Sequence, residues 1–206
     1  MCPHIRPSCC VTHPPTLTNP PAGYLVHWPG VSGKAVDAAD LKDERKASWL
    51  ALQRLYREGR VRSIGVSNYM PWHLEELCTA PWCEVKPMVN QFEIHPLLPQ
   101  ADMVAASRRW GCAVEAYSSL ARAAPELLES EAVKGAAAAH GVTPAQVALR
   151  WAVQQGFIVI PKSVQAARLA ENAAILTWAL SEDEMAAISA LSCGKRMCWD
   201  PTKVTA

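Results

Sequence analysis

Five short apolar runs recur along the chain, and each is followed by a polar stretch and then a helical pattern. The runs are continuous stretches of apolar and β-branched residues rather than strict alternations. Such runs are typical of parallel strands that helices cover. The pattern predicts strands at residues 24–27, 61–66, 88–92, 112–117 and 157–160.

The segments between these runs carry helix patterns with defined ends. Thr143 with Gln146 and Ser181 with Glu184 have the spacing of capping boxes, which start helices. Glycines follow the first three patterns, as is common after a helix. The predicted helices cover residues 45–58, 98–110, 143–155 and 181–191.

The alternation of strand and helix predicts an α/β class. Parallel strands joined by right-handed helical crossovers form either an open sheet or a (β/α) barrel. No G-x-G-x-x-G follows a predicted strand and no G-x-x-x-x-G-K-[ST] occurs in the sequence. A Rossmann site and a P-loop are therefore not expected.

Residues 1–22 differ from the rest in composition. They contain six prolines and three cysteines but no Asp, Glu or Lys. We expect a disordered or non-native lead-in there, and a domain over residues 23–206. A zinc site in this segment lacks an apolar framework, so reduced thiols and no metal are expected. The residues considered for zinc are Cys2, His4, Cys9, Cys10 and His13.

Charge and hydropathy exclude two classes of protein. Twenty basic and nineteen acidic residues give a net charge of +1, which argues against an electrostatic nucleic-acid binder. No run of 18 apolar residues occurs, so no membrane span is expected. The first residues lack the apolar core of a signal peptide. A cytoplasmic protein is the working expectation.

Polar side chains stand where the predicted strands end. They are His27, Ser67-Asn68, those in the stretch Asn90-Gln91-Phe92-Glu93, Tyr117-Ser118-Ser119 and Lys162-Ser163. Each alone has a structural interpretation: Ser67-Asn68 as a helix cap, His27 as a buried hydrogen-bonding group, Tyr117 as a packed aromatic. In a barrel, however, chemistry gathers at the ends of the strands. Together the five positions favour a shared polar site.

Six strings of residues resemble the aldo-keto reductases in order and spacing. The resemblance covers about residues 23–203 and implies a (β/α)8 barrel that reduces aldehydes and ketones with NADPH. The strings are YLVHWPG (24–30), EGRVRSIGVSNY (58–69), VNQFEIHP (89–96), EAYSSL (115–120), TPAQVALRW (143–151) and IPKSVQAARLAEN (160–172).

The resemblance implies an NADP(H) site. Ser67, Asn68 and Gln91 match the residues that bind the nicotinamide carboxamide, and Tyr117 matches the aromatic that stacks on its ring. The remaining matches are Ser118 and Leu120 for the pyrophosphate loop, Lys162, Ser163 and Arg168 for the 2′-phosphate, and Glu171 and Asn172 for the adenine. Ala121-Arg122 departs from the small residues common in that loop.

The 2′-phosphate assignment also has physical support. Lys162 and Ser163 precede a predicted helix, whose first backbone N–H groups and dipole attract an anion. Arg168 adds a planar guanidinium. A preference for NADP over NAD follows.

His27 matches the family's catalytic histidine, which works there with a tyrosine, a lysine and an aspartate upstream. Residues 1–26 contain no Asp, no Lys and one tyrosine, Tyr24. Tyr24 is three positions from His27, so the two side chains point to opposite faces of the strand. We therefore expect an incomplete barrel, with strands 4 to 8 present and strands 1 to 3 absent.

Three origins remain open for such a chain: a truncated gene product, a short isoform, or a non-catalytic NADP-binding or regulatory protein. The partner expected by resemblance is a small-molecule carbonyl substrate, and a complete barrel would be a monomer. His73, His95 and His140 have no metal-ligand spacing and are expected to be structural. Met197, Trp199 and Pro201 either cover the substrate pocket or pack outside the barrel.

Overall fold

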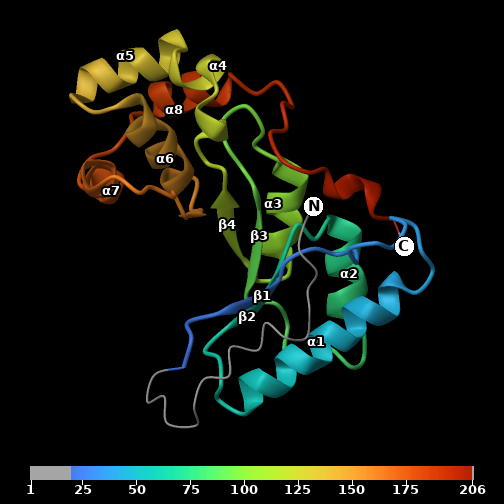
Figure 1. Cartoon of the computed structure of the whole chain (residues 1–206). Coiled ribbons are helices and arrows are strands. Elements are labelled where there is room, and N and C mark those ends of the chain that lie inside the picture. Colours follow the sequence, from blue (N-terminus) through green and yellow to red (C-terminus); the bar gives the residue numbers. More distant parts are fainter. Residues whose placement is uncertain (1–19, 206) are drawn as a thin grey trace. The chain divides into compact units, whose positions relative to one another are not determined.

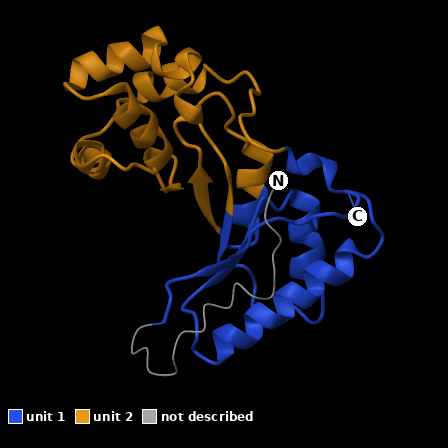
Figure 2. Cartoon of the chain, in the orientation of Figure 1, with its two compact units in different colours: residues 1–90, 106–112, 200–206 blue, residues 91–105, 113–199 orange. Residues whose placement is uncertain are grey.

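The structure is a computed structural model that describes residues 20–205. The cysteines and histidines considered for zinc at positions 2–13 lie outside the described residues. The chain divides into two compact units (Figure 2). Among the described residues, unit 1 comprises residues 20–90, 106–112 and 200–205, and unit 2 comprises residues 91–105 and 113–199.

Five strands form at the five predicted apolar runs (Figure 1). They follow one another in chain order in one sheet. Val26 pairs in parallel with Val66, and Glu115 with Ile158. The α/β class with a parallel sheet is thereby confirmed. The strands are β1 (Tyr24–Val26), β2 (Ile64–Ser67), β3 (Val89–Glu93), β4 (Ala113–Tyr117) and β5 (Ile158–Val159).

Unit 1 packs helices α1 (Leu41–Arg57) and α2 (Pro71–Thr79) around an apolar core. Trp49 and Leu52 of α1 are buried with Ile64 and Val66 of β2. The α1 helix begins four residues before its predicted start, because Leu41 is fully buried and adds a turn to the apolar face. No pattern predicted α2, which is nine residues long and starts at a proline.

Unit 2 contains most of the remaining helices. Both predicted capping boxes form: the Gln146 N–H donates to Thr143 Oγ1 at 3.2 Å, and the Glu184 N–H donates to Ser181 Oγ at 3.2 Å. The helices of this unit are α4 (Pro125–Leu128), α5 (Glu131–His140), α6 (Pro144–Gln154), α7 (Ala166–Ala173) and α8 (Glu182–Ser189). Short 3₁₀ helices lie at Ala121–Ala123, Ala174–Leu176 and, in unit 1, Pro201–Lys203.

Helix α3 (Ala101–Arg109) has residues in both units and starts later than predicted. The prediction of a start at Leu98 was wrong, because the backbone turns back on itself there. The Leu98 N–H donates to the His95 carbonyl at 2.8 Å, and Gln100 has a left-handed φ of 49°. Among residues 20–205, no helix combines the length and apolar character that crossing a bilayer requires.

Candidate functional site

In unit 1, three of the predicted site residues meet around one side-chain amide. Asn68 follows β2 with a left-handed φ of 62°. Its Nδ2 donates to Ser67 Oγ at 3.0 Å and to the His27 carbonyl at 3.2 Å. Ser67 and Asn68 are buried, whereas His27, just after β1, is exposed. The amide therefore fixes the end of β2 to the end of β1.

In unit 2, Gln91 on β3 pairs with a residue that the sequence analysis missed. Its Nε2 donates to the Glu115 carboxylate on β4, and both side chains are half-buried. Glu115 is a carboxylate within an otherwise apolar strand, which is the signal that could have identified it. This contact sets the orientation of the Gln91 amide.

Tyr117 ends β4 with its side chain half-buried. Burial is the main cause of the raised pKa of its phenol, so the ring stays neutral at ordinary pH. The next residue, Ser118, has a φ of 52°, and its Oγ lies 3.3 Å from Cys198 Sγ. The end of β4 thus carries a neutral aromatic ring and then a sharp change of chain direction.

The loop after Ser118 contains an unusual turn. Ala121, Arg122 and Ala123 have φ values of 47°, 53° and 59°, the left-handed region that glycine favours. The Ala121 N–H donates to the Ser118 carbonyl at 2.7 Å, and Leu120 is half-buried. Residues larger than glycine therefore adopt here a backbone conformation suited to glycine.

Two cations are exposed near the start of α7: Lys162 in the loop after β5, and Arg168 within the helix itself. Within residues 20–205, neither Lys162 nor Arg168 has a hydrogen-bond or ion-pair partner, and both are exposed. Ser163 shapes the loop, because its Oγ accepts from the Gln165 N–H at 3.1 Å. Among the residues that the structure describes, no carboxylate pairs with this positive charge near the start of α7.

Glu171 and Asn172 lie half-buried on α7. The Glu171 carbonyl accepts from Gln146 Nε2 at 3.0 Å, which joins α7 to the start of α6. The capping glutamine of α6 therefore also holds the helix that carries the two predicted adenine-facing residues.

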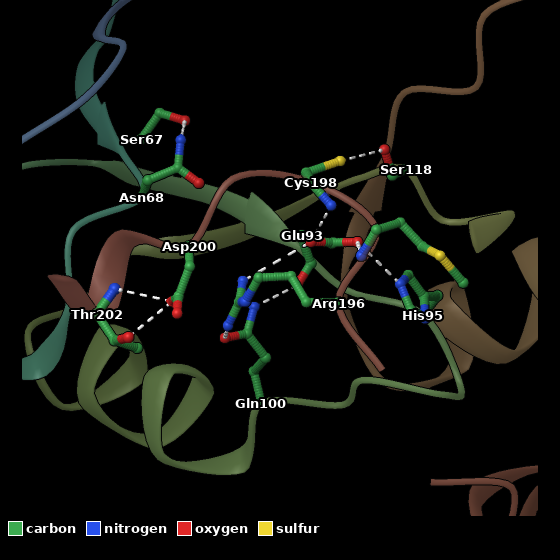
Figure 3. A network of polar contacts seen from close by, with 11 residues as sticks. Ser67, Asn68, Glu93, His95, Gln100, Ser118, Arg196, Cys198, Asp200 and Thr202 are labelled. Atoms are coloured by element: carbon green, nitrogen blue, oxygen red, sulfur yellow. Dashed lines mark hydrogen bonds and ion pairs between the residues drawn. The ribbon is translucent and has the colours of Figure 1, made fainter. Parts of the chain in front are cut away.

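At the end of β3, Glu93 and its neighbours form a buried polar network (Figure 3). The Glu93 carboxylate accepts from the backbone N–H groups of Met197 and Cys198, and Arg196 and His95 lie beside it. The sequence analysis placed Glu93 at this strand end but assigned it no role in the site. Its spacing of two residues from Gln91, which places both on one face of the strand, was the available signal.

The histidines expected to be structural have protein partners. His73 Nδ1 accepts from the Met70 N–H, His95 Nε2 contacts Glu93, and His140 Nε2 contacts Glu184. Across the described part of the chain, no group of three or more His, Cys, Asp or Glu side chains could hold a metal ion.

Comparisons with known proteins connect this arrangement to one family. The sequence profile described as "Aldo/keto reductase family" matches residues 18–192. The chain is 40% identical over 181 residues to a glyoxal reductase of Bacillus subtilis (strain 168), covering 88% of this chain and 60% of that protein. It is 37% identical over 178 residues to the methylglyoxal reductase DkgA of Yersinia pestis, with 86% and 60% covered.

Solved structures give the same result. The apo form of Gox0644 matches with a TM-score of 0.74 at 34% identity, covering 90% of this chain and 63% of that one. An aldo-keto reductase, AKR2E5, solved as a complex with NADPH matches with a TM-score of 0.76 at 29% identity, with 86% and 56% covered. The chain thus spans about 60% of the length of the relatives it matches. It belongs to the aldo/keto reductase family.

Proposed function

We propose that the chain binds NADP(H) and is all or part of an oxidoreductase that reduces aldehyde or ketone carbonyls to alcohols. The observation that carries this proposal is the pair of exposed cations Lys162 and Arg168 near the turn made by Ser163, for which residues 20–205 supply no partner. A 2′-phosphate fits there, because its negative charge can pair with both cationic side chains. This preference for a phosphate favours NADP(H) over NAD(H).

Each of the other residues has a role in holding the cofactor. Ser67, Asn68 and Gln91 would hydrogen-bond the nicotinamide carboxamide, and their burial or side-chain pairing preorganises them for it. Tyr117 would stack on the ring with its neutral phenol. Ser118 and Leu120 would follow the pyrophosphate, and Glu171 and Asn172 would face the adenine.

The cofactor, when bound, supplies the hydride that reduces the carbonyl carbon. His27 would hold the carbonyl oxygen, since its exposed imidazole follows β1 and its backbone is fixed by Asn68. The relatives named as glyoxal and methylglyoxal reductases make small reactive carbonyl compounds the first substrates to try.

We further propose that the five strands correspond to strands 4 to 8 of the family's barrel. His27 is then the one residue of the proton-donating tetrad that the resemblance assigns to this sequence. Tyr24 lies within β1, three residues before His27, and is 43% exposed. Side chains three positions apart on a strand point to opposite faces, so Tyr24 does not serve as a proton donor beside His27. This supports a second candidate function, an NADP(H)-binding protein without turnover.

The test uses the full chain and two measurements. A fluorescence titration compares NADPH with NADH, and an assay follows NADPH consumption with glyoxal, methylglyoxal and simple ketones. Binding with turnover supports the reductase, and binding without turnover supports the second candidate. Absence of NADPH binding contradicts both.

A further inference from the structure

Glu93 at the end of β3 holds a segment more than one hundred residues away in sequence. Its Oε1 accepts from the Met197 N–H at 2.7 Å, and its Oε2 accepts from the Cys198 N–H at 3.1 Å (Figure 3). The Glu93 side chain is fully buried. We call residues 195–198 the tail segment. One carboxylate thus fixes two consecutive amides of the tail segment.

Two side chains complete the surroundings of this carboxylate. His95 Nε2 donates to Oε1 at 3.1 Å, and Arg196 Nη1 lies 3.7 Å from Oε2. Burial alone would raise the pKa of Glu93, but the hydrogen bonds from His95, Met197 and Cys198 outweigh it and lower the pKa. Glu93 is therefore an ionised acceptor, whose bonds to N–H groups are stronger than those of a neutral one.

Gln100 extends the network to a second point on the tail segment. Arg196 Nη2 donates to Gln100 Oε1 at 3.0 Å, and Gln100 Nε2 donates to the Glu93 carbonyl. Because Gln100 binds both the backbone of Glu93 and the side chain of Arg196, the guanidinium has a fixed direction. These hydrogen bonds form only when Arg196 of the tail segment lies beside Gln100 and Glu93.

The far end of the tail segment reaches a residue of the proposed cofactor site. Cys198 Sγ lies 3.3 Å from Ser118 Oγ, directly after Tyr117 on β4. Glu93 itself is two residues after Gln91 on β3. The tail segment is therefore attached at the ends of two adjacent strands that carry proposed nicotinamide-binding residues.

We infer that Glu93 is a positioning residue, which holds the tail segment beside Ser118 so that Met197 and Cys198 form a wall of the nicotinamide end of the site. This inference rests on the proposed NADP(H) function. Glu93 acts through the amides of Met197 and Cys198, so its removal should release these two residues, while Lys195 stays bound to the Leu97 carbonyl and the residues proposed to hold the cofactor keep their own contacts.

Hydrogen exchange of single amides in the full chain tests the positioning directly. In Glu93→Gln, the Met197 and Cys198 amides should exchange at least about tenfold faster, because a neutral amide replaces an ionised acceptor of both N–H groups. The Cys193 and Lys195 amides are internal controls, since both donate to the Leu97 carbonyl at 3.2 Å. Unchanged exchange at Met197 and Cys198, or an equal rise at all four amides, would overturn the inference.

A second variant keeps the test decisive if Glu93→Gln unfolds the chain. Arg196→Gln leaves the buried carboxylate intact and removes its ion pair and the bond to Gln100. It should speed exchange at Met197 and Cys198 about threefold. The matched control is Glu126→Gln, which removes an exposed ion pair to Lys195 of the same segment and should leave both rates unchanged. No difference between these two variants counts against the inference.

NADPH binding provides a readout that a purely structural role would not move. Saturating NADPH should slow exchange at Met197 and Cys198 in the wild-type chain but not in Glu93→Gln, whose NADPH dissociation constant should stay within threefold of the wild type. Exchange that NADPH leaves unchanged in the wild type overturns the inference. If the wild-type chain binds no NADPH, the proposed function fails, and the exchange of the two variants alone decides whether Glu93 positions the segment.

Discussion

Arg45 on α1 and Glu76 on α2 form a two-pronged ion pair, with Arg45 Nε 3.0 Å from Oε1 and Nη2 2.8 Å from Oε2. The Arg45 side chain is only 4% exposed, and its Nη1 also donates to the Pro29 carbonyl at 3.2 Å. Pro29 lies two residues after His27. The buried guanidinium therefore joins α1 and α2 to the segment that leaves β1 at the candidate site.

Replacing this arginine should destabilise the protein. Arg45→Ala leaves the Glu76 carboxylate and the Pro29 carbonyl without their donor, so we expect a loss of about 3 kcal/mol in the free energy of unfolding. Chemical denaturation measures it. The control is Arg57→Ala, whose ion pair with Glu84 is exposed and should contribute less than about 1 kcal/mol. Equal losses would show that burial of the pair is immaterial.

The free energy of unfolding should decrease as the pH is lowered, because of His73. Burial, followed by the charge of Arg45, lowers the pKa of this imidazole from 6.5 to about 4. The unfolded chain therefore binds a proton that the folded chain refuses between these values. Stability due to neutral His73 is complete above pH about 6.5 and is lost as pH falls toward 4, by up to about 3 kcal/mol at 1.36 kcal/mol per pKa unit.

His73→Gln tests this dependence, since glutamine does not titrate. Denaturation at several pH values should show a shallower fall between pH about 6.5 and about 4 in the variant than in the wild type. His27→Gln, which removes an exposed imidazole, should retain the wild-type fall. An unchanged profile in His73→Gln contradicts the prediction.

The left-handed turn after Ser118 should be relieved by glycine. Ala123 has a φ of 59°, which costs a non-glycine residue about 1 kcal/mol. Ala123→Gly should therefore raise stability or leave it unchanged. Ala138→Gly is the matched control: this exposed alanine lies within α5, where glycine costs about 1 kcal/mol. In thermal denaturation, the melting temperature of Ala123→Gly should be unchanged or higher than that of the wild type, whereas that of Ala138→Gly should be lower.

Gly65 in β2 has no room for a side chain. A Cβ there would lie 2.5 Å from the Val89 carbonyl oxygen and 2.7 Å from a methyl group of Leu25. Gly65→Ala should cost about 2 kcal/mol, because the neighbouring strand must move. Gly135→Ala adds the same methyl group to α5, where nothing lies within 4 Å, and should gain up to about 1 kcal/mol. Similar effects at both positions would refute the packing argument.

The proposed 2′-phosphate site predicts a difference between two cofactors. Lys162→Ala and Arg168→Ala should each weaken NADPH binding at least about tenfold and NADH binding less than about twofold, because NADH lacks the phosphate. Fluorescence titration measures both. Lys42→Ala is the control, an exposed lysine on α1. Equal losses for the two cofactors would contradict the assignment.

Local sequence patterns determined much of the fold. The five apolar runs became five strands, since buried parallel strands need continuous apolar residues on both faces. Thr143 and Ser181 start α6 and α8 as predicted, because a capping box is a contact between residues three apart. The polar positions at the ends of the strands could also be identified locally, because they adjoin the apolar runs in sequence. The six strings of residues that carry the family resemblance include these positions.

Tertiary structure decided the contacts that join distant residues. The bond from Met197 to Glu93 spans 104 positions, and no local pattern relates the two. Helix α2 has a weak pattern of its own and depends on burial of Leu74 and Leu77 in the core of unit 1. The left-handed turn at 121–123 carries no glycine, so only packing of the surrounding chain enforces it. Local sequence patterns determine which residues form a strand or a helix and which of its faces is buried. Long-range packing determines which distant residues those faces contact.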